Sequence, residues 1–522
     1  METSPDSLLS TGRKLARNTL WNAVSSLWQG LALLALVPYI VHRVGLESYG
    51  IWVVLTAVVS YFDLADVTGK ITLGKFVAQY HALGDRESLA SALDSGALFY
   101  AALVSLIVAL GLLFGAALLH VLQIPIARQD EARLVFNLAL VAFCLMAMSN
   151  VWASVLAGLQ RLDILTSISS VATALKLGAT VWVLQSGWDL RGLAIVEVGA
   201  AGVSLLGLMI CARKIYPPLR VRPWKFDGAM MKRIAVMGAQ LNLSSAAEII
   251  QLQLDKLLLS RFLGVQFVAY YDIGTRLIKY LRGFLLGTAS SLTPVAAEMT
   301  AHGQHARLQR LYRTCAKAMA LLAVGSFGAL FLTAPQVLVL WVGEAFPLSV
   351  GTMRILCVAY AFSTLTGVGF FISNGAGRPE FQARTAPLQT VLNIAFSGFL
   401  FWRLGFYGAP LGTALAMGAG ALYFLATWGR AAGVSLAEFL REVAAKPLFA
   451  ALAAALAVSL ASARVPVPDS RSSAFFIIMV ETLVFSVLYL LLLKACRLWT
   501  REEKSSLQRH LPPRLRGLTA WL

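Results

Sequence analysis

Long apolar stretches, separated by short polar segments, occupy almost the whole chain. A helix that crosses a bilayer needs roughly 20 predominantly apolar residues, and the stretches are close to that length or longer. The fourteen predicted membrane-spanning helices are 18–40, 48–78, 91–119, 132–157, 164–185, 191–211, 233–260, 266–295, 312–334, 349–373, 385–403, 408–429, 447–462 and 474–494. No polar block is long enough to form a separate soluble domain. The pattern therefore predicts an all-α polytopic membrane protein with about 14 transmembrane helices.

Short segments of the first half of the chain recur in the second half. The matching segments are Lys75–Asp85 with Pro294–Gln304, Gly158–Asp163 with Gly375–Glu380, and Val44–Gly45 with Leu263–Gly264. In all three pairs the partners are about 217 to 219 residues apart, and three collinear matches are not expected by chance. Each half holds six predicted helices, and an even number returns the chain to its starting side of the membrane. We therefore expect two six-helix repeats related by a pseudo-twofold axis along the membrane normal, followed by an appended helix pair.

These patterns predict six consecutive parts of the chain. They are a cytoplasmic tail (1–17), an N-terminal six-helix bundle (18–211), a basic cytoplasmic linker (212–232), a C-terminal six-helix bundle (233–429), a loop with the appended helix pair (430–494) and a basic cytoplasmic tail (495–522).

The basic residues lie mainly on one predicted side of the membrane. The net charge is +18, from 44 Lys and Arg against 26 Asp and Glu. With the N-terminus in the cytoplasm, about 28 Lys and Arg fall on the cytoplasmic side and about 8 on the outer side. This positive-inside bias predicts that both termini are cytoplasmic. Topology and contact with anionic lipid headgroups explain the basic excess, so nucleic acid is not expected as a partner.

Charged residues line one face of the predicted helix 48–78. Asp63, Asp66 and Lys70 lie within about 60° of one another, while Lys75 lies further round and nearer the cytoplasm. A charge at the bilayer centre costs roughly 2.5–3.5 kcal/mol, so a stripe of charges indicates a function. Opposite signs three or four residues apart can pair, which lowers the cost of burial.

A matching stripe occurs on the predicted helix 266–295. Asp272, Arg276 and Lys279 occupy a similarly narrow arc, with Arg282 beside them. The alternative interpretation of both stripes is that the pairs only lock helices together or extend to the membrane interface.

The first helix of each repeat also has a polar face. Helix 233–260 carries Gln240, Ser244, Glu248, Gln251 and Asp255, and helix 18–40 carries Asn18, Asn22, Ser25 and Gln29. Four polar faces at matched positions predict a central water-filled cleft, although polar contacts that hold helices together are the alternative. Lys176 and Glu197 add a smaller polar patch in the first half.

Two roles follow from the residue types of this predicted cleft. The cations suited to a phosphate or pyrophosphate group are Lys70, Arg276, Lys279 and Arg282. The carboxylates suited to proton or sodium exchange are Asp66, Glu248 and Asp255. Further polar groups of the cleft are Asn22, Gln29, Asp63, Gln251 and Asp272, with Lys75, Lys176 and Glu197 as second-tier candidates.

The sequence contains no pattern typical of an enzyme or a metal site. His302 and His305 have ligand-like spacing but lie in a predicted cytoplasmic turn without a third ligand. A Gly-rich phosphate-binding loop is absent, so no ATPase is expected. The five cysteines are odd in number and show no paired spacing, so neither a disulfide framework nor a zinc site follows. We expect no enzymatic activity and no cofactor, only a transported H⁺ or Na⁺.

Several segments resemble the bacterial polysaccharide-unit flippases of the multidrug/oligosaccharidyl-lipid/polysaccharide exporter superfamily. They are the predicted first hairpin Val37–Trp52, the run Tyr61–Gly69 that leads to Lys75, and the turns Gly158–Arg161 and Asn374–Arg378. The resemblance covers nearly the whole chain, and the count of fourteen helices agrees with it.

This resemblance implies two six-helix bundles around a V-shaped cavity, and transport by alternating access. The implied substrate is an undecaprenyl-pyrophosphate-linked oligosaccharide, namely an O-antigen, capsule or exopolysaccharide repeat unit, whose movement to the outer leaflet is coupled to a proton or sodium gradient. The implied location is the bacterial cytoplasmic (inner) membrane, with a polysaccharide polymerase or chain-length regulator as a candidate partner.

Other functions remain open at this point. A flippase for the peptidoglycan lipid precursor is the nearer alternative. A drug/cation antiporter of the same superfamily usually has twelve helices and a less cationic cavity. A membrane glycan polymerase or ligase is disfavoured, because the predicted outer loops are short and lack clustered Arg, His or Glu.

Overall fold

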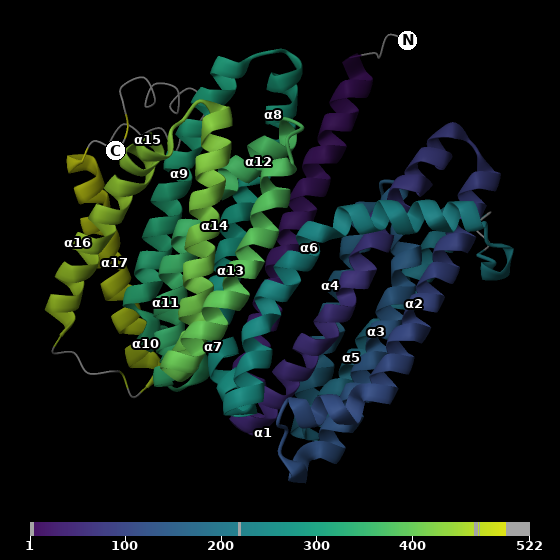
Figure 1. Ribbon diagram of the computed structural model, residues 1–522, viewed down its shortest axis with the longest axis horizontal. Coiled ribbons are helices and arrows are strands. Elements are labelled where there is room, and N and C mark those ends of the chain that lie inside the picture. The colour runs from purple at the N-terminus through teal and green to yellow at the C-terminus, as the bar shows by residue number, and fades with distance from the viewer. Residues whose placement is uncertain (1–4, 218–220, 464–467, 469, 497–498, 500–522) are drawn as a thin grey trace. The chain divides into compact units, whose positions relative to one another are not determined.

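The computed structural model describes residues 5–217, 221–463, 468, 470–496 and 499. Within its helices, the side chains of 5–27, 63–71 and 239–245 lie outside the description. The described residues form helices and no β-strand (Figure 1). Their contacts define two compact units, Met1–Ala269 (unit 1) and Tyr270–Leu522 (unit 2).

Unit 1 begins with a very long helix against which most of its other helices pack. The helices are α1 (Pro5–Leu83), α2 (Arg86–Val121), α3 (Gln129–Gly158), α4 (Leu162–Gln185), α5 (Asp189–Ile215) and α6 (Gly228–Leu263), with short 3-10 helices at Ile126–Arg128 and Pro223–Lys225. Helix α3 packs against α1, α2, α4 and α5, and α1 packs against α6. Helix α1 covers two predicted spans, which meet at a kink where Gly45 has non-helical φ and ψ angles (78° and 165°).

Polar groups of α2 fix the segment that connects α5 to α6. The Asp94 carboxylate accepts a hydrogen bond from the backbone N–H of Arg222. The Ser95 hydroxyl accepts from the Asp227 N–H at 3.0 Å and donates to the Asp227 carbonyl oxygen at 3.2 Å. The connecting segment therefore docks on α2. The compact units divide later in the chain, between Ala269 and Tyr270, so α6 packs with unit 1, and the bundle boundary near 212–232 stays a prediction.

Unit 2 is a bundle of helices that begins within α7, because the division between Ala269 and Tyr270 falls inside this helix. The helices are α7 (Val265–Ala289), α8 (Leu292–Ala301), α9 (His305–Leu332), α10 (Ala334–Val342), α11 (Pro347–Thr364), α12 (Gly367–Gly375), α13 (Glu380–Leu404), α14 (Gly408–Ala432), α15 (Leu436–Phe439), α16 (Ala445–Ser462) and α17 (Arg471–Ala495), with a 3-10 helix at Gly405–Tyr407 and a π-helix at Leu440–Ala444. Helices α13 and α14 form a tightly packed pair, α14 packs on α11, and α11 packs on α9. These four helices lie side by side in Figure 1.

The last two long helices pack on the rest of unit 2 through a buried apolar core. Phe485 and Tyr489 of α17 meet Ala450 and Ala454 of α16 beside Val324 of α9. The Tyr489 hydroxyl donates a hydrogen bond to the Leu321 carbonyl oxygen at 3.1 Å. The pair α16–α17 is therefore an integral part of unit 2.

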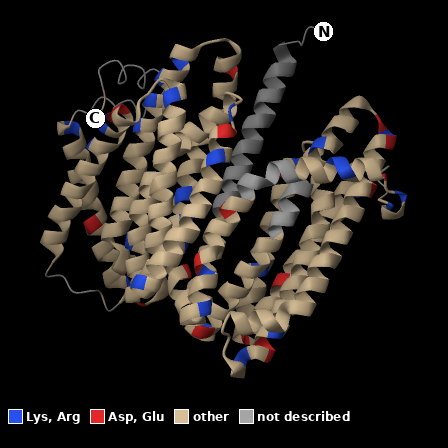
Figure 2. Cartoon of the chain, in the orientation of Figure 1, with Lys and Arg blue, Asp and Glu red and all other residues tan. Residues whose placement is uncertain are grey.

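The first two predicted spans lie in the single kinked helix α1, and each later span corresponds to one described helix or to a pair of consecutive helices. Among the described residues, ten helical segments are long and apolar enough to cross a membrane, and one of them, Glu380–Ala432, contains both α13 and α14. Most of the Lys, Arg, Asp and Glu positions coloured in Figure 2 lie near helix ends, as expected for helices that cross a lipid bilayer. The prediction of an all-α polytopic membrane protein is confirmed.

The turns that match in sequence also match in backbone conformation. The matched positions with positive φ are Gly45 (78°) and Gly264 (106°), Gly84 (70°) and Gly303 (66°), and Gln160 (57°) and Gly377 (73°). Positive φ is uncommon outside glycine, so its recurrence at all three pairs shows that both halves use the same turns.

Candidate functional site

In unit 1, an ion pair joins α4 to α5 within the predicted spans. Lys176 Nζ lies 2.5 Å from Glu197 Oε1, and the two side chains are 25% and 30% exposed. Two helical turns away on the same face of α4, the Ser169 hydroxyl donates to Gln29 Oε1 of α1 at 3.0 Å. The structure thus brings three sequence-predicted residues, Lys176, Glu197 and Gln29, onto a polar region shared by α1, α4 and α5.

Helix α6 carries three predicted polar residues whose exposure differs. Glu248 is exposed, Gln251 is half-buried, and Asp255 is 1% exposed. Their spacing of three and four residues places them on one helical face. Lys256, next to Asp255, is also buried. The two described candidates for ion binding therefore have different surroundings, because Asp255 is enclosed by protein and Glu248 is not.

Unit 2 buries an ion pair within a single helix. Asp272 of α7 is buried, and its carboxylate receives Arg276 through both Nε (2.9 Å) and a terminal nitrogen (2.7 Å). Both nitrogens meet the same carboxylate oxygen, Oδ2, so the contact is charge-assisted but is not the fork in which each nitrogen binds its own oxygen. Because the partners are four residues apart, α7 carries the pair without help from another helix.

Further along α7, Arg282 stacks on an aromatic ring of α11. Its guanidinium carbon lies 5.5 Å from the centroid of the Tyr360 ring. The Arg282 Nε is buried and has no hydrogen-bond partner among the described residues. Lys279, three residues earlier, is half-buried. An unsatisfied guanidinium N–H is a group that an anionic oxygen of a ligand can satisfy.

The side chains of eight predicted polar residues lie outside the described part of the structure: Asn18, Asn22, Ser25, Asp63, Asp66, Lys70, Gln240 and Ser244. Lys75 is described and is exposed. Next to it, α1 and α6 border a groove of about 580 Å³ lined by Phe76, Ala229, Lys232, Arg233, Val236 and Met237. Lys232 and Arg233 belong to the basic excess on the predicted cytoplasmic side, which by itself indicates only topology. Their position one turn inside α6 is the signal that could have indicated a basic groove.

A buried polar cluster in α13 and α14 was also missed. The Asn393 side-chain amide donates to the hydroxyl oxygens of Thr413 (2.8 Å) and Ser397 (3.3 Å). All three residues are buried, and Asn393 Oδ1 has no hydrogen-bond partner among the described residues. The run of polar residues Gln389, Asn393 and Ser397, spaced four apart in a predicted span, is the signal that could have located it.

Within each unit, the described side chains combine buried ionic groups with helices that are apolar elsewhere. Such groups can hold a charged substrate or exchange a cation. Whether the polar faces of the two halves share one cleft stays a prediction.

Comparisons with known proteins agree with this chemistry. A family model described as polysaccharide biosynthesis protein matches residues 15–300, and a model described as MatE matches residues 242–398. A curated protein of Shigella flexneri named "Putative O-antigen transporter" is 18% identical over 408 residues, which are 76% of this chain and 93% of that protein. "Uncharacterized membrane protein MJ1068" of Methanocaldococcus jannaschii is 23% identical over 212 residues, which are 39% of this chain and 40% of that protein.

Solved transporter structures share the fold. The lipid II flippase MurJ in an inward closed conformation has a TM-score of 0.74 at 12% identity, covering 92% of this chain and 98% of that chain. An inward-facing multidrug resistance MATE family transporter of the MOP superfamily has a TM-score of 0.68 at 16% identity, covering 80% of this chain and 94% of that chain. At such identities the likeness shows the fold alone.

Proposed function

We propose that this chain, which belongs to the polysaccharide biosynthesis protein family and to the MOP exporter superfamily, moves a lipid-linked oligosaccharide across the cytoplasmic membrane. The substrate is an undecaprenyl-pyrophosphate-linked repeat unit of an O-antigen, capsule or exopolysaccharide. Similarity to a protein named as an O-antigen transporter, over 93% of its length, supports this substrate class. The headgroup passes from the cytoplasmic to the outer leaflet by alternating access.

The observation that carries the proposal is the set of cations on α7. Arg276, Lys279 and Arg282 follow one another at intervals of three residues, in a helix where Asp272 is buried and paired. Ionic groups within a span are costly unless they have partners or line a polar path. A pyrophosphate carries several acceptor oxygens, so it requires several cations and N–H donors at once. The unsatisfied Nε of Arg282 is one such donor.

Energy for transport comes in this proposal from an ion gradient. The candidate carriers are the carboxylates Asp66, Glu248 and Asp255. The burial of Asp255 supports this role. A buried carboxylate pays a desolvation cost for its negative charge, and binding a proton or a sodium ion removes that cost. Collapse of the proton or sodium gradient in inverted vesicles is expected to stop substrate movement, and each gradient can be collapsed separately.

The double variant Arg276→Ala, Lys279→Ala tests the cation set. Two charge-assisted contacts of about 1.5–3 kcal/mol each predict a loss of apparent substrate affinity of roughly a hundredfold or more. In a deletion strain that expresses the variant, lipid-linked repeat units should accumulate on the inner leaflet, as measured by leaflet-selective labelling.

Arg403→Ala is the matched control, because this exposed arginine stacks on Trp402 at the end of α13 (5.0 Å) and lies far along the chain from α7. It should leave transport unchanged. Normal transport by the double variant, with normal insertion in the membrane, would falsify the pyrophosphate assignment.

A flippase for the peptidoglycan lipid precursor is the second candidate, favoured by the TM-score of 0.74 with MurJ. The two candidates differ in the sugar that they carry and not in the pyrophosphate. Rescue of a strain depleted of its lipid II flippase, without restoration of surface polysaccharide in the deletion strain, would select this second function. If the chain were instead a drug/cation antiporter, its expression should confer drug resistance, and neither rescue assay should give a positive result.

A further inference from the structure

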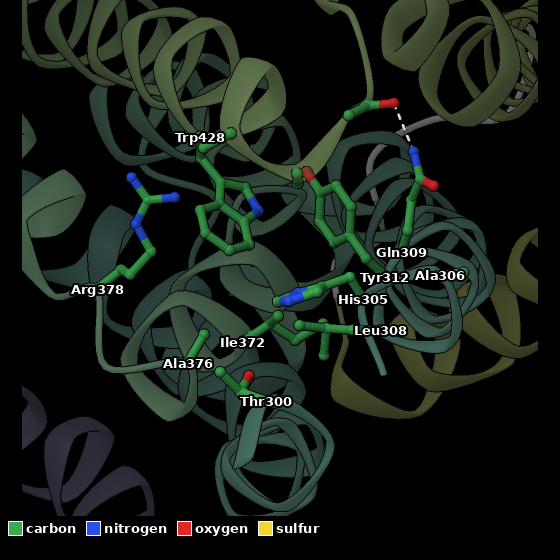
Figure 3. Close-up of a pocket in the computed structure, with 13 residues that line it drawn as sticks. Thr300, His305, Ala306, Leu308, Gln309, Tyr312, Ile372, Ala376, Arg378 and Trp428 are labelled. Atoms are coloured by element: carbon green, nitrogen blue, oxygen red, sulfur yellow. Dashed lines mark hydrogen bonds between the residues drawn. The ribbon is translucent and has the colours of Figure 1, made fainter. Parts of the chain in front are cut away.

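A pocket lies within unit 2, away from the cations of α7 in sequence, at the ends of α9, α12 and α14. It has a volume of about 450 Å³, and its polar lining consists of Thr300, His305, Gln309, Tyr312, Arg378 and Trp428 (Figure 3). By the predicted topology these helix ends face the cytoplasm. We call this site the Tyr312–Trp428 pocket.

Two buried donors of the pocket lack a hydrogen-bond partner in the part of the chain that the structure describes. Tyr312 is 1% exposed and Trp428 is 4% exposed. Neither the Tyr312 hydroxyl nor the Trp428 indole Nε1 has a hydrogen-bond partner among the described residues. The two rings meet edge to face with centroids 6.2 Å apart, and Figure 3 shows them side by side at the pocket. Buried polar groups are nearly always hydrogen-bonded, so two adjacent exceptions on one cavity indicate that a ligand supplies the acceptors.

Three further polar side chains line the pocket: Arg378, Gln309 and His305. Arg378 donates from its Nε to Glu380 Oε1 at 3.2 Å, and its guanidinium carbon lies 4.8 Å from the centroid of the Phe381 ring. Its two terminal nitrogens make no hydrogen bond to the described residues and can donate to a ligand. The Gln309 amide N–H donates to the Gly433 carbonyl oxygen at 2.6 Å, so the loop after α14 is held against α9. His305 is exposed at the first turn of α9. The groups available to a ligand are therefore mainly donors, and a ligand rich in acceptor oxygens fits them.

The first half of the chain shows that the fold does not require these donors. Its equivalent turn keeps the same arginine arrangement, because Arg161 Nε binds Asp163 Oδ1 at 3.1 Å. Counted from the first residue of each helix, the position of Tyr312 in α9 is that of Leu93 in α2, which is buried and apolar. Helix α5, the counterpart of α14, contains neither Trp nor Tyr. The repeat preserves the turn, and only unit 2 adds the polar donors.

We propose that the Tyr312–Trp428 pocket binds the phosphate group of an anionic ligand at the cytoplasmic face. A phosphate carries several acceptor oxygens, which suit donors such as the Arg378 guanidinium, the Tyr312 hydroxyl and the Trp428 indole N–H. The same phosphate chemistry occurs in soluble phosphate compounds and in the headgroups of anionic phospholipids. This site is separate from the transported substrate, so its occupancy can be measured without transport.

The test uses the purified full-length protein and three variants. Tyr312→Phe removes one unpartnered donor, Arg378→Gln removes the cation, and Arg161→Gln removes the equivalent arginine of the first half. Inorganic phosphate and ADP are titrated as soluble probes by calorimetry. Nanodiscs of phosphatidylcholine, with and without phosphatidylglycerol, provide the lipid arm, in which native mass spectrometry counts bound phosphatidylglycerol.

We expect one arm to show binding that weakens at least tenfold in Tyr312→Phe and in Arg378→Gln and is unchanged in Arg161→Gln. Binding of phosphate or ADP identifies a soluble ligand, and one retained phosphatidylglycerol identifies a lipid. Equal binding by all four proteins, or no binding in either arm, overturns the proposal. A lower Tm of ligand-free Tyr312→Phe would also contradict it, because the hydroxyl would then have a structural partner.

Discussion

Unit 1 and unit 2 hold the ion pairs within their predicted spans in different ways. In unit 1, Lys176 of α4 meets Glu197 of α5, so the pair depends on the spacing of two helices. In unit 2, Asp272 and Arg276 lie four residues apart on α7. A pair within one helix survives a rigid movement of that helix, whereas a pair between helices breaks if they separate. The comparison indicates that α7 can carry charge as it moves, while the α4–α5 pair locks its helices together.

Removal of Asp272 should have the largest effect on this comparison. Asp272→Ala leaves Arg276, whose side chain is 28% exposed, without its carboxylate. Breaking a buried pair costs about 3–5 kcal/mol, and the partial exposure of Arg276 puts the expected loss near the low end, at about 3 kcal/mol of unfolding free energy. Chemical unfolding of the purified protein measures it. The double variant Asp272→Asn, Arg276→Gln should recover most of the loss, and a cost below about 1 kcal/mol for Asp272→Ala would mean that the pair is not the support of α7.

The glycines that precede the two equivalent turns should respond unequally to alanine. A Cβ at Gly375 would lie 2.2 Å from the backbone oxygen of Thr293, whereas a Cβ at Gly158 would first meet the Val77 side chain at 2.6 Å. A side chain yields more easily than a backbone, so Gly375→Ala should cost about 2–3 kcal/mol and Gly158→Ala about 1 kcal/mol. The Tm of each variant in detergent checks the order. Equal shifts would show that unit 2 relaxes around this turn as readily as unit 1.

The helices and turns of both units could be predicted from sequence, because they depend on local properties of the chain. Apolar length sets the spans, and matched glycines such as Gly84 and Gly303 set the turns. Contacts between helices are harder to predict from sequence, because they depend on how each helix is rotated about its axis relative to its neighbours. Lys176 and Glu197 could be placed in one patch, but their direct contact could not be predicted. The cluster around Asn393 was missed for the same reason, since neutral polar side chains in a span can face either lipid or protein.

A double-mutant cycle on Lys176 and Glu197 should show a smaller coupling than the α7 pair. Both side chains are 25–30% exposed, so solvent screens their attraction, and a coupling energy of about 1 kcal/mol is expected. Unfolding of Lys176→Met, Glu197→Gln and the double variant provides the measurement. If this pair locks α4 to α5, either single variant should also increase hydrogen exchange in both helices. Coupling above that of Asp272 and Arg276 would reverse the comparison between the units.

The smallest effect is expected at the caps of α2 and α9, where the repeats differ by one acid. In unit 1 the Ser88 hydroxyl and its backbone N–H, the latter at 3.0 Å, bind Asp85 and lower the pKa of its carboxyl group. The equivalent cap of α9, Gln304, makes no such side-chain bond and does not titrate. Because the folded pKa is below the unfolded value of about 3.9, the contribution of Asp85 to stability is complete well above that pH and is lost as the pH falls through the folded pKa.

The Tm difference between wild type and Asp85→Ala should therefore be present at pH 7 and shrink on acidification, while Gln304→Ala should show no pH-dependent difference. A difference for Asp85→Ala that persists at low pH would mean that the cap acts through its shape and not through its charge.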